Sequence, residues 1–222
     1  GKSIFKSNKF NNLVLCETNS NVHYREQESF TANSKSIFNF TCTQNDSEVI
    51  EHLFKIEHKF LAGNANFGLG IVTGNNKKHC KPSQEDGLIA VYKGSEIHKD
   101  KLDQATCYIS NDFSKYQQVA PISLFLAKEK LIYRFISSDL VFFHDTNQNY
   151  VLNSANMLIV KNSFSISHEK VCKLLNSKII NWLFKRLFET HKVLRADIES
   201  LPIHTKYFDI YSDFSEQNYL NY

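Results

Sequence analysis

The sequence predicts an α+β fold with a β-rich centre, an N-terminal helix and a long C-terminal helix. Its 222 residues are 42% hydrophobic and 13% aromatic, with only seven Gly and three Pro. Such a composition favours a folded chain with a substantial core over a disordered one. Apolar residues also recur at helical spacing near both ends of the chain and form short strand-like runs between them.

Residues 1–66 are predicted to form an N-terminal segment that ends in a helix. Short apolar runs at 12–16 and 37–40 alternate with Asn- and Ser-rich stretches, which is the pattern of strands joined by loops. From 47 to 62 the apolar residues recur every three or four positions, and Gly63 follows as a stop. A helix near 47–62 is therefore expected.

Residues 67–205 are predicted to form the β-rich domain. Six of the seven glycines lie between Gly63 and Gly94, so this interval has the most demanding backbone geometry of the chain. Runs rich in β-branched and aromatic residues then follow, separated by polar turns, at 88–92, 106–109, 130–136, 140–143 and 156–160.

A long amphipathic helix is predicted to follow these strands and to reach residue 188. Ser167 can cap it, and Glu169 suits its positive first turn. Its apolar stripe consists of Val171, Leu175, Ile179, Trp182, Leu183 and Leu187. The tail at 206–222 has three acidic residues and no basic one from Tyr207 on, and it either packs on the domain or trails from it.

Basic residues are concentrated in and after this helix. Between Lys170 and Arg195 the sequence has seven Lys and Arg against a single acid, Glu189, whereas the whole chain carries a net charge of only +3. A local positive field of this kind attracts polyanions.

The cysteines and the hydropathy pattern indicate a cytoplasmic protein. Five scattered cysteines without a C-x-x-C pair suggest neither a disulfide framework nor a zinc site, and we expect them to be small buried hydrophobic residues. No apolar run approaches the roughly 20 residues that cross a bilayer, and no secretory leader opens the chain. No membrane partner is therefore expected. With Gly1 first and Met157 the single methionine, the chain reads as a piece of a longer polypeptide or as the product of tag removal.

Local catalytic motifs are missing from the sequence. The glycine loop at 68–78 fits neither nucleotide-binding pattern, and no N-P-P-Y-type loop exists because the three prolines are far apart. The one [DE]-x-K match, Glu57 to Lys59, falls inside the predicted helix 47–62 and is interpreted as surface charge. His144-Asp145 is interpreted as a turn rather than a catalytic dyad, and the histidines lack zinc-site spacing. We therefore predict no catalytic residue and no metal site.

Six short blocks follow one another in the sequence: GIVTGNN at 70–76, VYKGSEI at 91–97, LIYRFISS at 131–138, LNSAN at 152–156, LLNSK at 174–178 and LRADIESLPI at 194–203. Their order and spacing resemble the TaqI-like C-terminal specificity domain of N6-adenine DNA methyltransferases and of the type II restriction enzymes fused to them. The likeness covers about 67–203. It departs from the usual pattern at His79, where an aromatic such as Phe is common. Residues 1–66 would then be a leading arm or part of a neighbouring methyltransferase region.

The resemblance implies a target recognition domain of a restriction-modification enzyme. Such a domain binds double-stranded DNA, while a methyltransferase domain of the same polypeptide flips the adenine. S-adenosylmethionine is expected in that methyltransferase domain, and no cofactor is expected in this chain. The DNA-binding candidates are Thr73, Asn75, Asn76, Lys77, Lys78, Lys93, Arg134, Asn153, Asn156, Lys192 and Arg195.

Each candidate also has a structural interpretation. Arg134 could form an ion pair at a strand end, Lys93 could be a solvated charge, and the asparagines could simply form turns. Two other functions stay open. One is a stand-alone metal-dependent nuclease with carboxylates gathered from distant positions, and the other is a protein-interaction module that docks an acidic partner on the basic helix.

Overall fold

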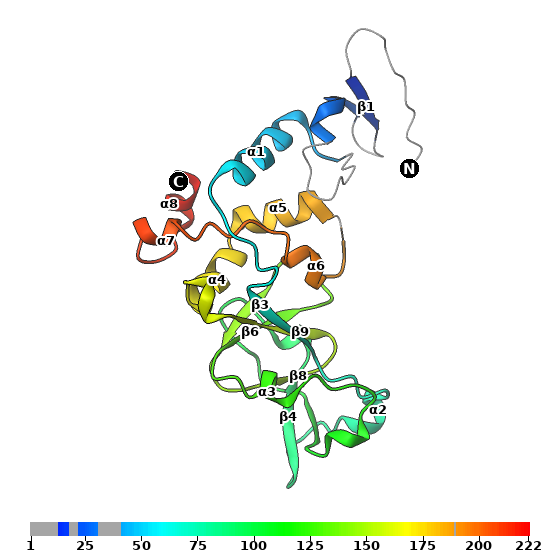
Figure 1. Cartoon of the computed structure of the whole chain (residues 1–222). Coiled ribbons are helices and arrows are strands. Elements are labelled where there is room, and N and C mark those ends of the chain that lie inside the picture. Colours follow the sequence, from blue (N-terminus) through cyan, green and yellow to red (C-terminus); the bar gives the residue numbers. More distant parts are fainter. Residues whose placement is uncertain (1–12, 18–21, 31–40, 189) are drawn as a thin grey trace.

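The structure is a computed structural model that describes residues 13–17, 22–30, 41–188 and 190–222. Its fold is mixed α+β with three small sheets, which confirms the predicted class (Figure 1). The predicted run at 37–40 lies outside the described residues. No helix among the described residues is long and apolar enough to span a membrane.

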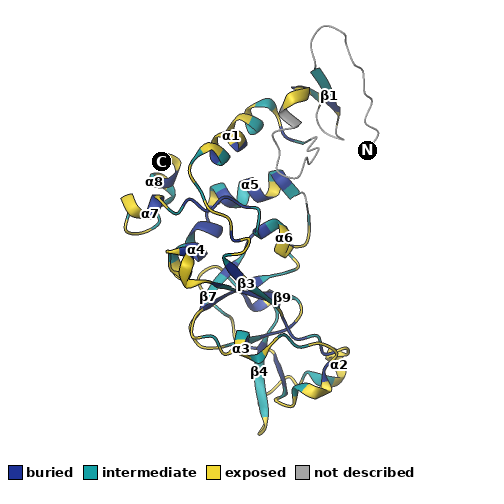
Figure 2. Ribbon diagram, in the orientation of Figure 1, coloured by how far each residue is buried: buried dark blue, intermediate teal, exposed yellow. Residues whose placement is uncertain are grey.

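A four-stranded antiparallel sheet forms the middle of the molecule. Its strands, in spatial order, are β3 (Ala65–Leu69), β9 (Ala155–Val160), β6 (Lys130–Arg134) and β7 (Phe142–Asp145). Successive side chains alternate between two hydrophobic clusters, so that Leu131 and Leu158 face one cluster while Ile132 and Met157 face the other. The sheet therefore separates two cores, and Figure 2 shows buried residues along its strands.

The predicted turn at His144-Asp145 is wrong, because both residues belong to strand β7. Asp145 is fully buried and its carboxylate accepts from Lys130 Nζ at 2.6 Å. The backbone N–H of Asn149 and its side-chain amide supply further donors. This buried ion pair fixes the end of β7 rather than forming a catalytic dyad.

Helices cover one face of the central sheet, above it in Figure 1. They are α1 (Gln44–Lys55), α4 (His168–Leu175), α5 (Lys178–Phe188) and α6 (Arg195–Ile198), with the short η5 (Asn162–Phe164) before α4. The N-terminal helix begins earlier than predicted because Thr43 and Asp46 form a capping box. It also ends earlier, since Ile56 is extended and Lys59 pairs with the backbone of Ile203.

The single long C-terminal helix was a wrong prediction, because the chain breaks between α4 and α5 at Asn176 and Ser177. The Asn176 amide turns to strand β7, where it accepts from Phe142 N at 2.9 Å and donates to Phe142 O at 2.8 Å. The Ser177 hydroxyl accepts from the backbone N–H of Ile180 at 3.2 Å. Asn and Ser side chains that bond the backbone in this way compete with a continuous helix. Ser167 does cap α4, as predicted.

A second layer lies on the other face of the sheet. It contains the three-stranded sheet of β5 (Cys107–Ser110), β4 (Leu88–Tyr92) and β8 (Tyr150–Val151), in that order, and the short helices α2 (Asn76–His79), α3 (Ile122–Phe125), η3 (Gly94–Glu96) and η4 (Phe113–Lys115). Strands β4 and β5 are antiparallel, whereas β4 and β8 are parallel.

Two of the five cysteines form a disulfide, which corrects the expectation of buried thiols only. Cys80 follows α2 and bonds Cys107 in β5. The neighbouring residues Lys81 and Tyr108 form an antiparallel bridge, and the Cα atoms of Cys80 and Cys107 lie 5.1 Å apart. Sequence spacing gave no hint of this pairing. Cys16, Cys42 and Cys172 are buried thiols, as predicted.

The two ends of the described chain pack on the helical layer. The hairpin of β1 (Leu13–Glu17) and β2 (Val22–Glu26), with η1 (Gln27–Phe30), lies beside α1. At the other end, α7 (Tyr207–Ile210) and α8 (Glu216–Leu220) bury Tyr207, Phe208 and Tyr219 in the core of the helical layer. Of the two alternatives for the tail, packing is the one observed.

Candidate nucleic-acid interface

The loop at 152–155 is the point where the predicted site segments meet. The backbone of Ile71 donates to Val151 O at 2.8 Å, and Asn153 N donates back to Ile71 O at 3.1 Å. From the other side, Gly94 N donates to the Ser154 hydroxyl at 2.9 Å and Phe135 N to Ser154 O at 2.9 Å. Four of the six sequence blocks therefore converge on one loop.

Two glycines allow this convergence. A Cβ on Gly70 would lie 2.2 Å from Leu152 O and 2.4 Å from Ala155 O, and one on Gly94 would lie 2.4 Å from Ser154 O. Backbone atoms cannot give way as flexible side chains do, so these positions need Gly. The candidate residues did not include these glycines, although both lie in the blocks that resemble the family.

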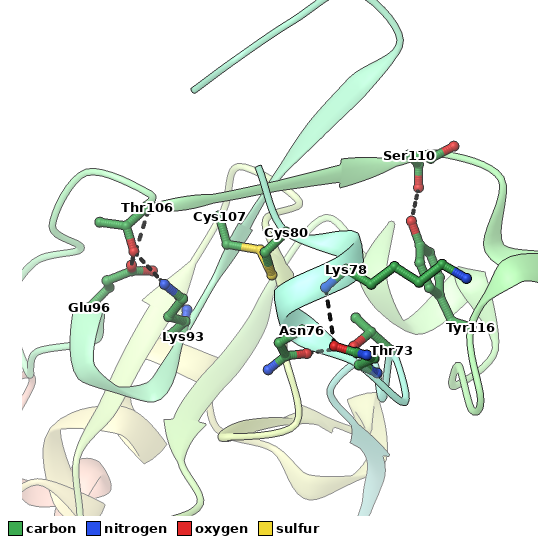
Figure 3. Close-up of a disulfide and its surroundings, with 11 residues drawn as sticks. Thr73, Asn76, Lys78, Cys80, Lys93, Glu96, Thr106, Cys107, Ser110 and Tyr116 are labelled. Atoms are coloured by element: carbon green, nitrogen blue, oxygen red, sulfur yellow. Dashed lines mark hydrogen bonds between the residues drawn. A yellow bond between two sulfur atoms is a disulfide. The ribbon is translucent and has the colours of Figure 1, made fainter. Parts of the chain in front are cut away.

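The segment from Thr73 to Lys78 forms a tip around α2 (Figure 3). The Thr73 hydroxyl donates to Asn76 Oδ1 at 2.5 Å, and Asn75 Oδ1 caps the helix by accepting from Lys78 N at 3.1 Å. The oxygens of both asparagines are thus engaged within the tip. Lys77 and Lys78 are exposed, and neither forms an ion pair with a carboxylate of the described residues.

Three other candidates have structural roles. Arg134 is half-buried and donates from Nε to Ile97 O at 2.7 Å rather than forming a strand-end ion pair. Asn156 is only 6% exposed, and its Oδ1 accepts from Gly70 N at 3.3 Å. Lys93 donates from Nζ to the Thr106 hydroxyl at 2.7 Å. These contacts hold the loops in place.

The remaining candidates are exposed. Asn153 lies at the surface of the central loop, and Lys192 pairs through its backbone with Ile136 in an antiparallel bridge. Arg195 begins α6, bonds Glu199 at 2.8 Å and lies over the Phe67 ring at 5.1 Å from the centroid. Because Val193 N also donates to Phe135 O at 2.9 Å, the segment at 190–195 is tied to the same loops.

Comparison with known proteins shows the family to which the chain belongs. Residues 89–203 match the family model of the TaqI-like C-terminal specificity domain. The chain belongs to this family. The matched range begins after α2, so the tip at 73–78 lies outside it.

A type II methyltransferase, M.VspI of Vibrio sp. (strain 343), is 53% identical over 84 residues. The alignment covers 38% of this chain and 21% of that methyltransferase. The matched part of the chain therefore corresponds to about a fifth of that methyltransferase. A specificity domain of methyltransferase-related proteins implies DNA recognition.

The basic stretch predicted as one helix forms α4 and α5, and several of its cations are paired with acids. Lys173 bonds Glu169 at 2.9 Å and Asp213 at 2.8 Å, and Lys185 bonds Asp139 at 2.5 Å. The hydrogen bond to Asp213, followed by that to Glu169, raises the pKa of Lys173. Acids from outside the basic stretch thus compensate part of its charge.

The acidic tail supplies part of this compensation. Besides Asp213, it contributes Glu216, which accepts from Lys178 N at 2.7 Å at the start of α5. Phe208 of the tail lies under the Lys170 ammonium, 5.2 Å from the ring centroid. The acidic tail thus contacts both basic helices, α4 and α5, of the same chain.

Groups that could serve metal-dependent chemistry are dispersed. Within the described parts of the chain, no three His, Cys, Asp or Glu side chains lie close enough to hold a metal ion. Glu57, from the one [DE]-x-K match, is paired with Lys206. His168 packs against His144 and accepts from Val160 N at 3.0 Å, so that nitrogen is occupied.

Proposed function

We propose that this specificity domain binds double-stranded DNA in a sequence-specific way as the target recognition part of a restriction-modification enzyme. It positions the DNA for adenine N6 methylation by a methyltransferase domain of the same polypeptide, which holds S-adenosylmethionine. Cleavage, where the parent enzyme has that activity, belongs to other domains. The convergence of four of the six sequence blocks on the loop at 152–155 is the observation that carries this proposal.

The proposed contacts are of two kinds, those to the DNA phosphates and those to the base edges. Lys77 and Lys78 at α2, with Lys192 and Arg195 near α6, offer exposed cations for phosphates. Asn153 is exposed on the loop at 152–155, which hydrogen bonds connect to both of these segments, and it offers its amide to a base edge.

The other candidates act indirectly in this proposal. Arg134, Asn156 and Thr73 hold the loops through hydrogen bonds to groups of the chain itself. Residues 67–205 form the recognition domain, residues 1–66 lead into it, and residues 206–222 stabilise it by covering the helical layer. Removing a positioning residue should weaken binding through disorder of a loop rather than through a lost charge.

A binding experiment with the 222-residue chain tests the proposal. Selection from a pool of randomised duplexes at low salt should recover a recurrent adenine-containing motif. Replacing both Lys77 and Lys78 with Ala should weaken binding to that motif, whereas Lys55→Ala, at the far side of the central sheet on α1, should not. Equal effects of the two variants would contradict the assignment of the binding face.

Two further results would favour the alternatives. Magnesium-dependent cleavage of the duplexes by this chain alone would support a nuclease. No binding at low salt, even when the chain is correctly folded, would support a protein-interaction module and would reject DNA recognition by this chain.

A further inference from the structure

The segment at 116–118 runs beside the α2 tip and carries two neighbouring exposed glutamines. Gln118 exchanges backbone hydrogen bonds with Val72, with N to O distances of 2.9 and 3.1 Å. A Cβ built on Gly74 would lie 3.5 Å from both Cβ and Oε1 of Gln117. The Gln117 amide therefore lies against the turn that leads into α2.

This segment is rigidly mounted. Tyr116 is 8% exposed, donates from Oη to Ser110 O at 2.7 Å and packs edge-on against His79. The disulfide between Cys80 and Cys107 joins the end of α2 to β5, the strand that also carries Ser110 (Figure 3). A side chain on a fixed backbone can discriminate between bases because it loses little freedom on binding.

Gln117 also has the hydrogen-bonding capacity that the tip asparagines lack. Asn75 and Asn76 each use the side-chain oxygen within the tip. The Gln117 amide, by contrast, forms no hydrogen bond with any described residue and is exposed. An amide recognises adenine through two bonds, accepting from N6 and donating to N7, so it needs both its oxygen and its nitrogen.

Cations lie next to this amide. Figure 3 shows the Lys78 side chain extending from α2 toward Tyr116, the residue before Gln117. Lys77 and Lys78 are exposed on the same four-residue helix. Phosphate contacts from these lysines would fix the register in which the neighbouring amide meets a base.

We propose that Gln117 is a specificity-determining residue that reads one adenine of the target, with Oε1 accepting from N6 and Nε2 donating to N7. The inference rests on the proposed function, because it requires the chain to bind duplex DNA. It assigns base reading at this tip to a residue outside the six sequence blocks, and it leaves phosphate contacts to Lys77 and Lys78.

Three variants of the full 222-residue chain test this inference. Gln118 provides the matched control, since it is the neighbouring exposed glutamine and its backbone pairs with Val72. Duplex selection with the wild-type chain first defines the preferred motif. Each single base-pair change in that motif is then measured with Gln117→Ala, Gln118→Ala and Gln117→Glu.

Gln117→Ala should reduce discrimination at one A·T pair by roughly 5- to 140-fold, the equivalent of one bidentate contact, and leave the other pairs unchanged. Gln118→Ala should discriminate as the wild type does. Gln117→Glu replaces the amide donor with an acceptor, so its preference at that pair should shift from adenine toward cytosine. The salt dependence of binding should stay the same for both alanine variants.

The outcomes separate this inference from the proposed function. If the wild type selects a motif and Gln117→Ala reads it with unchanged preference, Gln117 is not a base reader, although DNA recognition stands. If Gln117→Ala weakens binding equally to every sequence, its role is grip and the inference is overturned. If the wild-type chain selects no motif, both proposals are rejected.

Discussion

The packing of Gly70 against the loop at 152–155 makes a specific prediction for Gly70→Ala. The new Cβ would lie 2.2 Å from Leu152 O, whereas contacts below 3.4 Å are already tight, so the loop would have to retreat by about 1 Å. Overpacking of this kind costs about 1–3 kcal/mol. Loss of one backbone hydrogen bond to the loop adds about 1 kcal/mol. We therefore expect the free energy of unfolding to fall by about 2–4 kcal/mol.

Equilibrium urea unfolding, followed by circular dichroism, measures this change. Gly94→Ala would clash with the same loop from the other side, because its Cβ would lie 2.4 Å from Ser154 O. Once one substitution has displaced the loop, the second should cost less, so the double variant should be less destabilised than the sum of the single variants by at least about 0.5 kcal/mol. Gly87→Ala is the control, since nothing lies within 4 Å of its Cβ and only the positive φ is strained.

A loss below about 1 kcal/mol for Gly70→Ala, or strict additivity with Gly94→Ala, would refute the argument that these glycines admit the loop. A loss for Gly87→Ala equal to that for Gly70→Ala would also refute it, because the close approach to the loop would then contribute nothing. The same variants should weaken DNA binding, since the loop carries Asn153.

Three further predictions concern charge. Burial lowers the pKa of His204 to about 4, whereas the unfolded chain takes up this proton near pH 6.5. The free energy of unfolding should therefore be highest above pH 6.5 and fall by about 3 kcal/mol toward pH 4. His204→Asn should flatten this pH dependence, as measured by urea unfolding. With four exposed cations on phosphates, the slope of log binding constant against log salt should be about −3 to −4, and replacing both Lys77 and Lys78 should reduce its magnitude by about two. Lys130→Met should destabilise the fold by about 3–5 kcal/mol because it leaves a buried carboxylate unpaired, whereas Lys55→Met on the surface should cost less than about 1 kcal/mol.

Each of these has a contrary result. Stability that stays constant between pH 6.5 and 4 would contradict a neutral buried His204. A slope of −5 to −7, which six to eight phosphate contacts would give, would mean that further cations touch the DNA. Equal losses for Lys130→Met and Lys55→Met would mean that the buried pair is not needed for stability.

The sequence predicted the strands better than the helices. The strands at 88–92, 130–134 and 155–160 were found because they are rich in β-branched and aromatic side chains, and the last two lie in the central sheet that is buried on both faces. Strand β3 was missed, since its sequence ANFGL has weak strand propensity and it pairs with β9, about ninety residues away in sequence. Such a strand is specified by its partner.

The break in the C-terminal helix could not be predicted from helical periodicity alone. The apolar stripe continues across Asn176 and Ser177, but the Asn176 amide bonds to Phe142 in a distant strand. The disulfide escaped prediction for a similar reason, because its cysteines are 27 residues apart and meet only when β5 forms. Both features depend on tertiary contacts that local patterns do not contain.

The same limit explains how the candidate site changed. The sequence blocks meet at one loop, yet they could not show which side chains are exposed, so Asn156 and Arg134 were grouped with exposed residues. Charge density was misleading as well. The lysines of α4 and α5 are dense in sequence, but acids from elsewhere in the chain pair with two of them, Asp213 with Lys173 and Asp139 with Lys185.

The positive surface is therefore set by where acids are absent rather than by where lysines are most frequent. On the described surface, Asp213 of the tail pairs with Lys173 of the helical layer, while Lys77, Lys78 and Lys192, like Lys170 and Lys178, have no carboxylate partner among the described residues. Because screened interactions between exposed charges fade over about 10 Å, a polyanion senses these local imbalances more than the net charge of +3. A duplex should accordingly approach along α2 and the segment at 190–195, where the loops that carry the amides also converge.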